Sequence, residues 1–381
     1  MVFMQDVSVS VKSKSSMAVS LRRFLMICLG AGAAWVLLAD ARAICGGIQQ
    51  GMSLCVEVVI PSLFPFMVFT SFLALSGLAD MVSRLLAPVT RRMFRLPANA
   101  GATVLMSFIG GFPVGGRMAA RLVRDRAVPP EEGRRMLCFC INAGPSFILT
   151  AVGARMFGSA AAGGMMLCAH ILASCTAGLL SSLGRPVPQR EPEAPKTKAI
   201  PITQALIQAV IDSANGMLVL CAFIILFSGL TAWLEPTAAR WGENALLALG
   251  LLEVTKGCQQ AAAFPGLLGE LTAVFLLSFS GLSVIAQVLS GFTAEEIPLR
   301  PGKVVLWRLI NVGCAVGWYL AIRGILGKFL YKAEPVFLRL PQASPSLASR
   351  PATLPLTFCL LAVCAIALLT AESVFSESKK S

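Results

Sequence analysis

The sequence has few charged residues, since Asp, Glu, Lys and Arg together make up 13% of its 381 residues. A soluble domain has nearer ~25%. Hydrophobic residues account for 56%, and several apolar runs reach the length of about 18 residues at which a segment becomes a candidate membrane span. These runs do not alternate apolar and polar residues, so they do not suggest barrel strands. The composition excludes an ordinary soluble domain and predicts an all-α polytopic membrane protein.

Histidine is nearly absent, because His170 is the only one in the sequence. A single histidine leaves no Ser-His-Asp or Cys-His set, and neither H-E-x-x-H nor G-x-x-x-x-G-K-[ST] occurs. The sequence therefore predicts no enzyme and no cofactor. His170 follows Met166 and Cys168, which suggests either a soft-metal site or, with more support, a polar residue packed between helices.

No C-x-x-C pair occurs among the 12 cysteines, most of which lie inside apolar runs. Buried, inert thiols are the usual state of such residues, so the sequence predicts neither a metal site nor a disulfide framework. The net charge of +13 comes from Lys and Arg in short connections between apolar runs. Such residues mark membrane topology, so we expect the lipid bilayer as the main partner and no nucleic acid.

Composition divides the chain into consecutive segments. We expect a disordered leader at 1–20, an N-terminal anchor helix at 21–52, a first repeat at 53–183, a cytoplasmic linker at 184–204, a second repeat at 205–292, and C-terminal transmembrane helices with a tail at 293–381. The sequence Ala41-Arg42-Ala43 also fits signal-peptide cleavage, but later spans favour an anchor. Either alternative places the N-terminus in the cytoplasm. Pro61 and Pro65 predict a kinked helix in the first repeat.

The two repeats have helix breaks at matching places, which is the best sequence pointer to a central binding site in a membrane protein. Residues 98–120 lie between two arginine-rich flanks and contain Gly110-Gly111 and Gly115-Gly116, which predicts a re-entrant hairpin. Residues 246–264 predict a second hairpin that enters from the opposite side. Charge counting therefore predicts an inverted repeat, with about eight spans and two re-entrant hairpins, and places Arg300, Lys303 and Arg308 in the cytoplasm.

Broken helices leave backbone N–H and C=O groups free to bind polar solutes or ions. We expect the four breaks to meet near the midplane, and we predict Glu253 to pair with Lys256 there and Glu270 to cap a helix start. The alternative is that these small and polar residues only join helices. The candidate substrate-binding residues are Gly111, Pro113, Gly115, Gly116, Asn142, Ser146, Glu253, Thr255, Lys256, Ser280, Ser283 and Gln287.

Three segments resemble a known family: Ile60-Pro61-Ser62-Leu63-Phe64-Pro65-Phe66, Gly111-Phe112-Pro113-Val114-Gly115 and Asn142-Ala143-Gly144-Pro145-Ser146-Phe147-Ile148. They are similar to the YlbJ-like sporulation integral membrane proteins, a group within the nucleoside-recognition, or Gate, domain proteins. Phe279-Ser280-Gly281-Leu282-Ser283 with Gln287 resembles the second-half motif. The resemblance covers about residues 50 to 330. It implies the cell or forespore membrane of a spore-forming bacterium and a role in spore formation, but it does not imply nucleoside binding here.

Two functional hypotheses follow. The first is a protein that translocates or gates a small solute or ion through the midplane breaks during sporulation. The second is a non-transporting scaffold for a sporulation complex, made with other sporulation membrane proteins or with further copies of the chain. Substitutions at the breaks separate them, because only the first hypothesis makes those residues essential.

Overall fold

The structure is a computed structural model that describes residues 23–32, 34–188, 200–242, 248–291 and 301–330. Within these residues all regular elements are helices, as predicted. Five are long and apolar enough to cross a membrane: Ala41–Leu75, Ala160–Ser182, Ile202–Arg240, Gly266–Ser290 and Gly302–Leu326. The predicted leader at 1–20, most of the linker and the last apolar run at 354–371 lie outside the described residues. The figure of eight spans stays a prediction.

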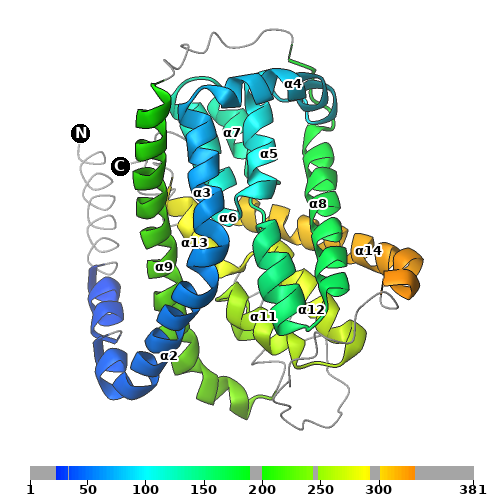
Figure 1. The fold of residues 1–381 in the computed structure, drawn as a ribbon. Coiled ribbons are helices and arrows are strands. Elements are labelled where there is room, and N and C mark those ends of the chain that lie inside the picture. The colour runs from blue at the N-terminus through cyan, green and yellow to red at the C-terminus, as the bar shows by residue number, and fades with distance from the viewer. Residues whose placement is uncertain (1–22, 33, 189–199, 243–247, 292–300, 331–381) are drawn as a thin grey trace, which may run out of the picture.

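The first long helix bends where prolines interrupt it. Helix α2 (Ala41–Leu54) passes through a π-helical turn, Cys55–Val59, into α3 (Ile60–Leu75). Pro61 lacks an N–H and crowds the carbonyl four residues earlier, and a π-turn is a common way for a helix to absorb such a defect. Figure 1 shows α2 inclined to α3, so the predicted kink is confirmed.

An arginine-rich end caps the molecule. Helix α4 (Leu78–Met93) lies across this end, and α5 (Gly101–Ile109, after a short turn at Ala98–Ala100) descends from it to the middle of the molecule (Figure 1). Helix α6 (Phe112–Arg124) returns to the same end, where α7 (Pro130–Met136) follows. The α5–α6 pair is therefore a hairpin whose two outer ends lie at the same end of the molecule. Its re-entry into a membrane stays a prediction.

The chain then crosses the molecule through an irregular stretch. Residues 137–146 carry no long helix and are largely buried, and they lead into the π-helix η3 (Phe147–Met156). Helix α8 (Ala160–Ser182) runs back to the arginine-rich end, and Ser159 caps it by accepting a hydrogen bond from the Ala162 N–H. Arg185 at the end of this passage pairs with Glu131 of α7 at 2.9 Å. This bond and the positive charge of Arg185 lower the pKa of the Glu131 carboxyl.

The second half begins with the longest helix, α9 (Ile202–Arg240), which runs from the arginine-rich end to the opposite end beside α2 and α3 (Figure 1). Helices α11 (Val254–Ala262) and α12 (Gly266–Phe279) form a second pair at the opposite end. Helix α13 (Gly281–Ser290) continues from α12 after a break at Ser280, and α14 (Pro301–Leu330) packs against α8 and α12.

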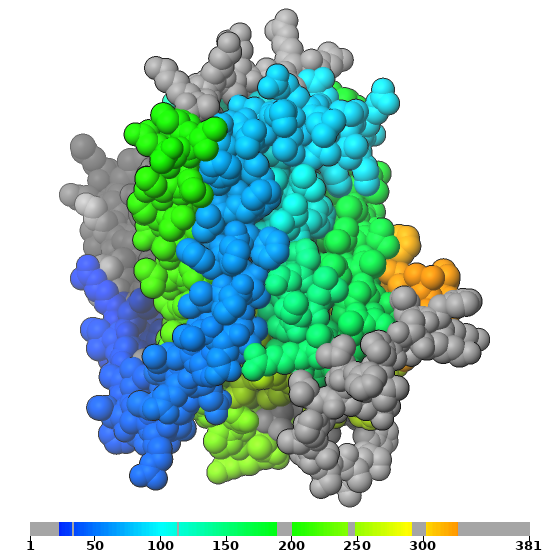
Figure 2. Space-filling view, viewed as in Figure 1, coloured from blue at the N-terminus to red at the C-terminus, as the bar shows by residue number. Residues whose placement is uncertain are grey.

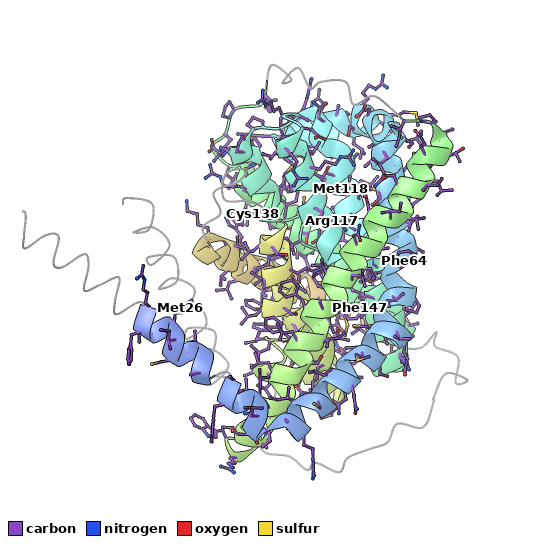
Figure 3. The ribbon with its side chains drawn as sticks, turned by 90° about the vertical axis from the view of Figure 1, so that its left-hand side faces the viewer. Met26, Phe64, Arg117, Met118, Cys138 and Phe147 are labelled. Atoms are coloured by element: carbon purple, nitrogen blue, oxygen red, sulfur yellow. The ribbon has the colours of Figure 1, made fainter. Side chains whose placement is uncertain are left out.

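The outer faces of the long helices are apolar, as a lipid-facing surface requires. Figure 2 shows α2 and α3 across the front of the molecule, with α9 on the left and α8 on the right. Exposed side chains on these helices include Val56, Phe69, Leu172, Leu206 and Leu218. Met26, labelled in Figure 3, lies on an apolar N-terminal helix that stands apart from the bundle.

Candidate functional site

The irregular stretch at 137–146 is buried, and side chains satisfy its backbone. Asn142 is fully buried, and its Nδ2 donates to the carbonyl of Phe139 at 2.9 Å. His170 Nε2 accepts from the Ala143 N–H at 3.1 Å. Arg308 donates to the carbonyls of Ile141 at 2.6 Å and Cys138 at 2.7 Å. Non-helical backbone at membrane depth needs such protein cover, and these three side chains supply it.

The tip of the first hairpin packs directly on this stretch. Gly111 has a positive φ of +83°, which only glycine adopts at low cost, and an added Cβ there would lie 3.4 Å from the Gly144 nitrogen. An added Cβ on Gly115 would lie 1.8 Å from the carbonyl oxygen of Cys140. The predicted glycine positions are therefore places where two backbones touch, and the first hairpin and the first break form one unit.

The second hairpin and the second break are joined in the same way. The N–H groups of Leu282 and Ser283 donate to the carbonyls of Leu251 and Leu252, at 2.7 and 3.0 Å. Ser280 turns the chain with a φ of +79°, unusual for a residue with a side chain. Each break is thus fixed to the hairpin of its own half.

Four helix N-termini converge on a central cavity. Helices α6, η3, α11 and α13 begin at Phe112, Phe147, Val254 and Gly281, and residues of all four first turns line a cavity of about 30 Å³. Residues of the neighbouring long helices complete its wall. The lining consists of Val59, Leu63, Phe112, Gly144, Phe147, Leu220, Phe223, Ile224, Glu253, Val254, Thr255, Ser283, Val284 and Gln287. Residues of both hairpins and both breaks therefore lie around one cavity, as the sequence predicted.

The size of the central cavity limits its contents. About 10–15 Å³ is enough for one water molecule, whereas drug-sized ligands occupy pockets of roughly 300–1,000 Å³. A cavity of about 30 Å³ therefore has room for one or two waters or a small ion. Nothing as large as a nucleoside therefore fits in the central cavity of this structure.

Buried polar side chains line the central cavity, and two of them have an oxygen without a hydrogen-bond partner among the described residues. Glu253 is 1% exposed, and its carboxylate caps α11 by accepting from the N–H groups of Thr255 at 3.0 Å and Lys256 at 2.7 Å. Ser283 and Gln287 are also buried, and neither Ser283 Oγ nor Gln287 Oε1 has a hydrogen-bond partner among the described residues. Buried polar atoms without partners are costly, so such a pair in a cavity indicates a place for water or solute.

The predicted residues divide into those that line the central cavity and those that shape it. Glu253, Thr255, Ser283 and Gln287 line it. The others lie behind the lining, with Gly111, Gly115 and Gly116 at close backbone or helix contacts and Pro113 in the first turn of α6. Asn142 forms hydrogen bonds with Ser107 and Ser174, and Ser280 lies beside Arg308. Ser146 immediately precedes η3, and the Lys256 side chain extends away from the cavity to Glu235.

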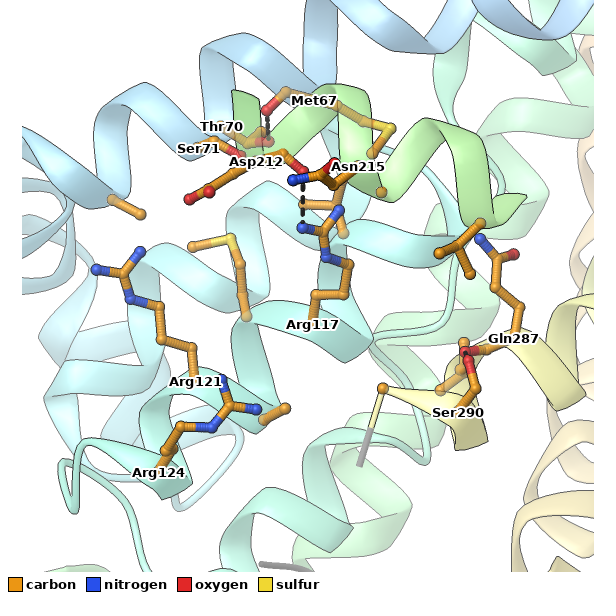
Figure 4. A pocket seen from close by; sticks show the side chains of 18 of the residues that line it. Met67, Thr70, Ser71, Arg117, Arg121, Arg124, Asp212, Asn215, Gln287 and Ser290 are labelled. Carbon is orange, nitrogen blue, oxygen red and sulfur yellow. Dashed lines mark hydrogen bonds between the residues drawn. The ribbon is translucent and has the colours of Figure 1, made fainter. Parts of the chain in front are cut away.

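A vestibule of about 600 Å³ lies between the central cavity and the arginine-rich end (Figure 4). We call it the arginine vestibule, because Arg117, Arg121 and Arg124 line it together with Asp212 and Asn215. Gln287 belongs to both the vestibule and the central cavity, so the two spaces adjoin. Figure 3 places Arg117 on α6 in the middle of the molecule, deeper than the ends of the helices.

Arg117 is the innermost charge of the arginine vestibule. Its Nη2 donates to the backbone carbonyl of Asp212 at 3.1 Å, while the Asp212 carboxylate accepts from Gln208 at 2.8 Å. The guanidinium lies on the backbone of α9, since an added Cβ on Gly216 would be 1.7 Å from Arg117 Nη1. Arg121 pairs with Asp125 at 3.5 Å. The vestibule therefore keeps a positive charge at its inner end.

A second vestibule of about 600 Å³ lies at the opposite end, between α2, η3, α9 and α11. We call it the paired-charge vestibule, because Lys256 Nζ bonds Glu235 at 2.7 Å and Arg155 bonds Glu57 at 3.4 Å. The predicted pair between Glu253 and Lys256 is wrong. Glu253 uses its oxygens to cap α11, so the Lys256 side chain extends into the vestibule instead.

Two further predictions are corrected. Arg308 is not an exposed cytoplasmic residue but is fully buried on α14. Its position inside the apolar run 304–326 indicates burial, whereas charge counting groups it with the neighbouring Lys303 as a basic flank. Glu270 does not cap α12, which begins after Pro265, but lies inside that helix and accepts from the Tyr319 hydroxyl at 2.8 Å. His170 is a packed polar residue whose Nδ1 lies 3.3 Å from Ser278 Oγ.

Comparison with known proteins identifies relatives of the chain. Residues 56–185 match the Gate family, described as nucleoside recognition. The chain is 29% identical over 298 residues to the sporulation integral membrane protein YlbJ of Bacillus subtilis (strain 168), a match that covers 66% of this chain and 71% of that protein. No solved structure matches. The resemblance predicted from the sequence is confirmed for both the Gate family and the YlbJ-like proteins.

Proposed function

We propose that this Gate-family relative translocates a small solute across a bacterial membrane through the central cavity. The observation that carries the proposal is the alignment of three spaces. Two vestibules of about 600 Å³ reach inward from opposite ends, and a constriction of about 30 Å³ lies between them. A protein that moves a solute needs access from both sides and a closed midplane between them, and the two vestibules with the narrow cavity support such an arrangement.

The proposal includes an inverted repeat. Helices α3 and α9 run in opposite directions, the α5–α6 hairpin enters from the arginine-rich end, and the 248–262 hairpin enters from the opposite end (Figure 1). Arginines gather at one end, on α4, α6, α7 and the end of α8, so the positive-inside rule assigns that end to the cytoplasm. The arginine vestibule then faces the cytoplasm, and the paired-charge vestibule faces the other side.

The geometry favours an anionic solute. Four helix N-termini face the central cavity, and a helix N-terminus carries a partial positive charge of about half an elementary charge. Discontinuous membrane helices bind anionic groups at such ends. Arg117 adds a positive charge on the path from the arginine-rich end. The N-terminus of α11 already holds the carboxylate of Glu253, and that of α13 donates to the carbonyls of Leu251 and Leu252. The N-termini of α6 and η3 are therefore the ones left for the solute.

The positive field of the arginine vestibule has a measurable consequence. A cysteine introduced at Asn215, which is exposed in the vestibule, will react faster with an anionic than with a cationic thiol reagent. Fields of this kind change local encounter rates by about tenfold or more. Arg117→Gln will lower the ratio of the two rates several-fold, and Arg134→Gln on α7, outside the vestibule, will leave it unchanged. A ratio that does not respond to Arg117→Gln would argue against anion selection.

The name of the YlbJ relative suggests the biological setting. We infer that the chain acts during sporulation, in the cell or forespore membrane, and that it does so without catalysing a reaction. The alternative is a non-transporting scaffold for a sporulation complex, favoured by the small volume of the central cavity. The scaffold predicts tolerance of polar substitutions around that cavity, whereas translocation predicts loss of function there.

Labelling from each side of the membrane tests the proposed function. Single cysteines at Asn215 and Gln259 lie in the arginine vestibule and the paired-charge vestibule, respectively. A membrane-impermeant thiol reagent, corrected for labelling of the parent chain, will modify position 215 only from the cytoplasm and position 259 only from the other side. Reaction of both positions from the same side would contradict the inverted repeat and the proposed passage.

A further inference from the structure

Arg308 is the largest side chain that is fully buried in the described part of the protein. Its two terminal nitrogens bond backbone carbonyls of the first break, Ile141 and Cys138, and Nη1 also lies 3.5 Å from Ser280 Oγ in the second break. Within the described residues no carboxylate pairs with it. A charge at membrane depth is costly unless it is compensated, and here carbonyl oxygens compensate it.

The partners of Arg308 are the kind of groups that hold a free cation in other carriers. In transporters with broken helices, unwound backbone carbonyls and half-helix C-terminal ends coordinate Na⁺ or bind a proton. In this chain Cys138 and Ile141 supply unwound carbonyls, and Ser280 follows the C-terminal end of α12. The guanidinium therefore occupies a place where an exchangeable cation would otherwise be expected.

We propose that Arg308 is a tethered cation that replaces a bound coupling cation at the breaks. Arg308 neutralises the carbonyls of the first break and reaches the Ser280 hydroxyl in the second. A covalently attached charge cannot dissociate during the transport cycle. The chain consequently needs no Na⁺ at this place, and α14 becomes part of the solute-binding unit. This inference rests on the proposed function, because a coupling cation matters only in a protein that transports a solute. Its test, however, measures stability and does not require the solute.

Chemical rescue of a truncated side chain tests the proposal. Arg308→Ala leaves the carbonyl oxygens without a cation, and a ligand that binds only the folded state raises its stability. We expect the purified variant to melt several degrees higher in about 10 mM methylguanidinium, or in sodium rather than choline chloride at equal ionic strength. The wild-type protein and the Lys303→Ala variant, altered at an exposed residue of the same helix, will not respond. Equal responses in all three proteins, or a sodium response in the wild type, would overturn the proposal.

A pair of variants of similar length covers the case in which Arg308→Ala does not fold. Arg308→Lys keeps the charge and Arg308→Met removes it. The proposal predicts that the lysine variant accumulates in membranes at near wild-type amounts and that the methionine variant does not. Equal amounts of the two would show that size rather than charge matters and would overturn the proposal. Failure of the proposed translocation would appear in the two-sided labelling and would leave these stability results unaffected.

Discussion

Gly115→Ala will strongly destabilise the folded protein and lower its amount in membranes. The added methyl group would lie 1.8 Å from the carbonyl oxygen of Cys140 and 2.7 Å from Ser107 Cβ. The group in the way is the backbone carbonyl of Cys140. Its neighbours Phe139 and Ile141 are hydrogen-bonded to Asn142 and Arg308, so a shift of this backbone would break those bonds. Overpacking of a core costs about 1–3 kcal/mol and occasionally more, and we expect a loss at the upper end of that range.

The control for this substitution is Gly164→Ala on α8. An added Cβ at Gly164 meets no atom within 4 Å, and alanine is the better helix former by about 1 kcal/mol. Thermal melting in detergent and the amount of protein in membranes will therefore fall for Gly115→Ala and hold or rise for Gly164→Ala. Similar melting temperatures for the two variants would mean that the first hairpin does not pack on the first break.

Glu253→Gln will remove function while the protein still inserts in the membrane. The substitution keeps the size of the side chain but replaces one capping oxygen with an NH₂ group, which faces an N–H donor of Thr255 or Lys256. Loss of an N-cap costs about 0.5–2 kcal/mol, which leaves a protein of this size folded. The first turn of α11 lines the central cavity, so its rearrangement alters the proposed solute site directly.

Spore yield in the native host measures this effect. We expect Glu253→Gln to lower the number of heat-resistant spores by about tenfold or more, because ionisable residues inside membrane segments are commonly functional. Glu131→Gln, at an exposed pair with Arg185 far from the cavity, will leave both spore number and protein amount unchanged. Normal sporulation with Glu253→Gln would favour the scaffold hypothesis.

The hairpins and the polar residues of the central cavity could be predicted from the sequence, because both leave a local pattern in it. Gly110-Gly111 between basic flanks predicts a turn in the membrane, and Glu253, Thr255, Ser283 and Gln287 stand out as polar residues in apolar runs. The apolar wall at Leu220 and Ile224 leaves no such trace, because lipid-facing and cavity-facing leucines have the same composition.

The remaining errors concern long side chains, whose direction depends on tertiary structure. Lys256 lies three residues from Glu253, yet it reaches Glu235 because the carboxylate is already engaged by backbone N–H groups. Charge counting assigned Arg308 to the cytoplasm because that method weighs only sequence neighbours. The carbonyls that accept hydrogen bonds from Arg308 lie roughly 170 residues earlier in the chain. A count of charges near one segment cannot predict a contact between residues so far apart in the sequence.

Access to Ser283 from both sides of the membrane tests the central cavity most directly. Ser283 is 2% exposed in this structure and lines the central cavity. If the protein alternates between openings to the two sides, Ser283→Cys will react above the parent chain with a small membrane-impermeant thiol reagent added to either side. A cysteine at 283 that stays unreactive from both sides in folded protein would contradict a passage through the breaks.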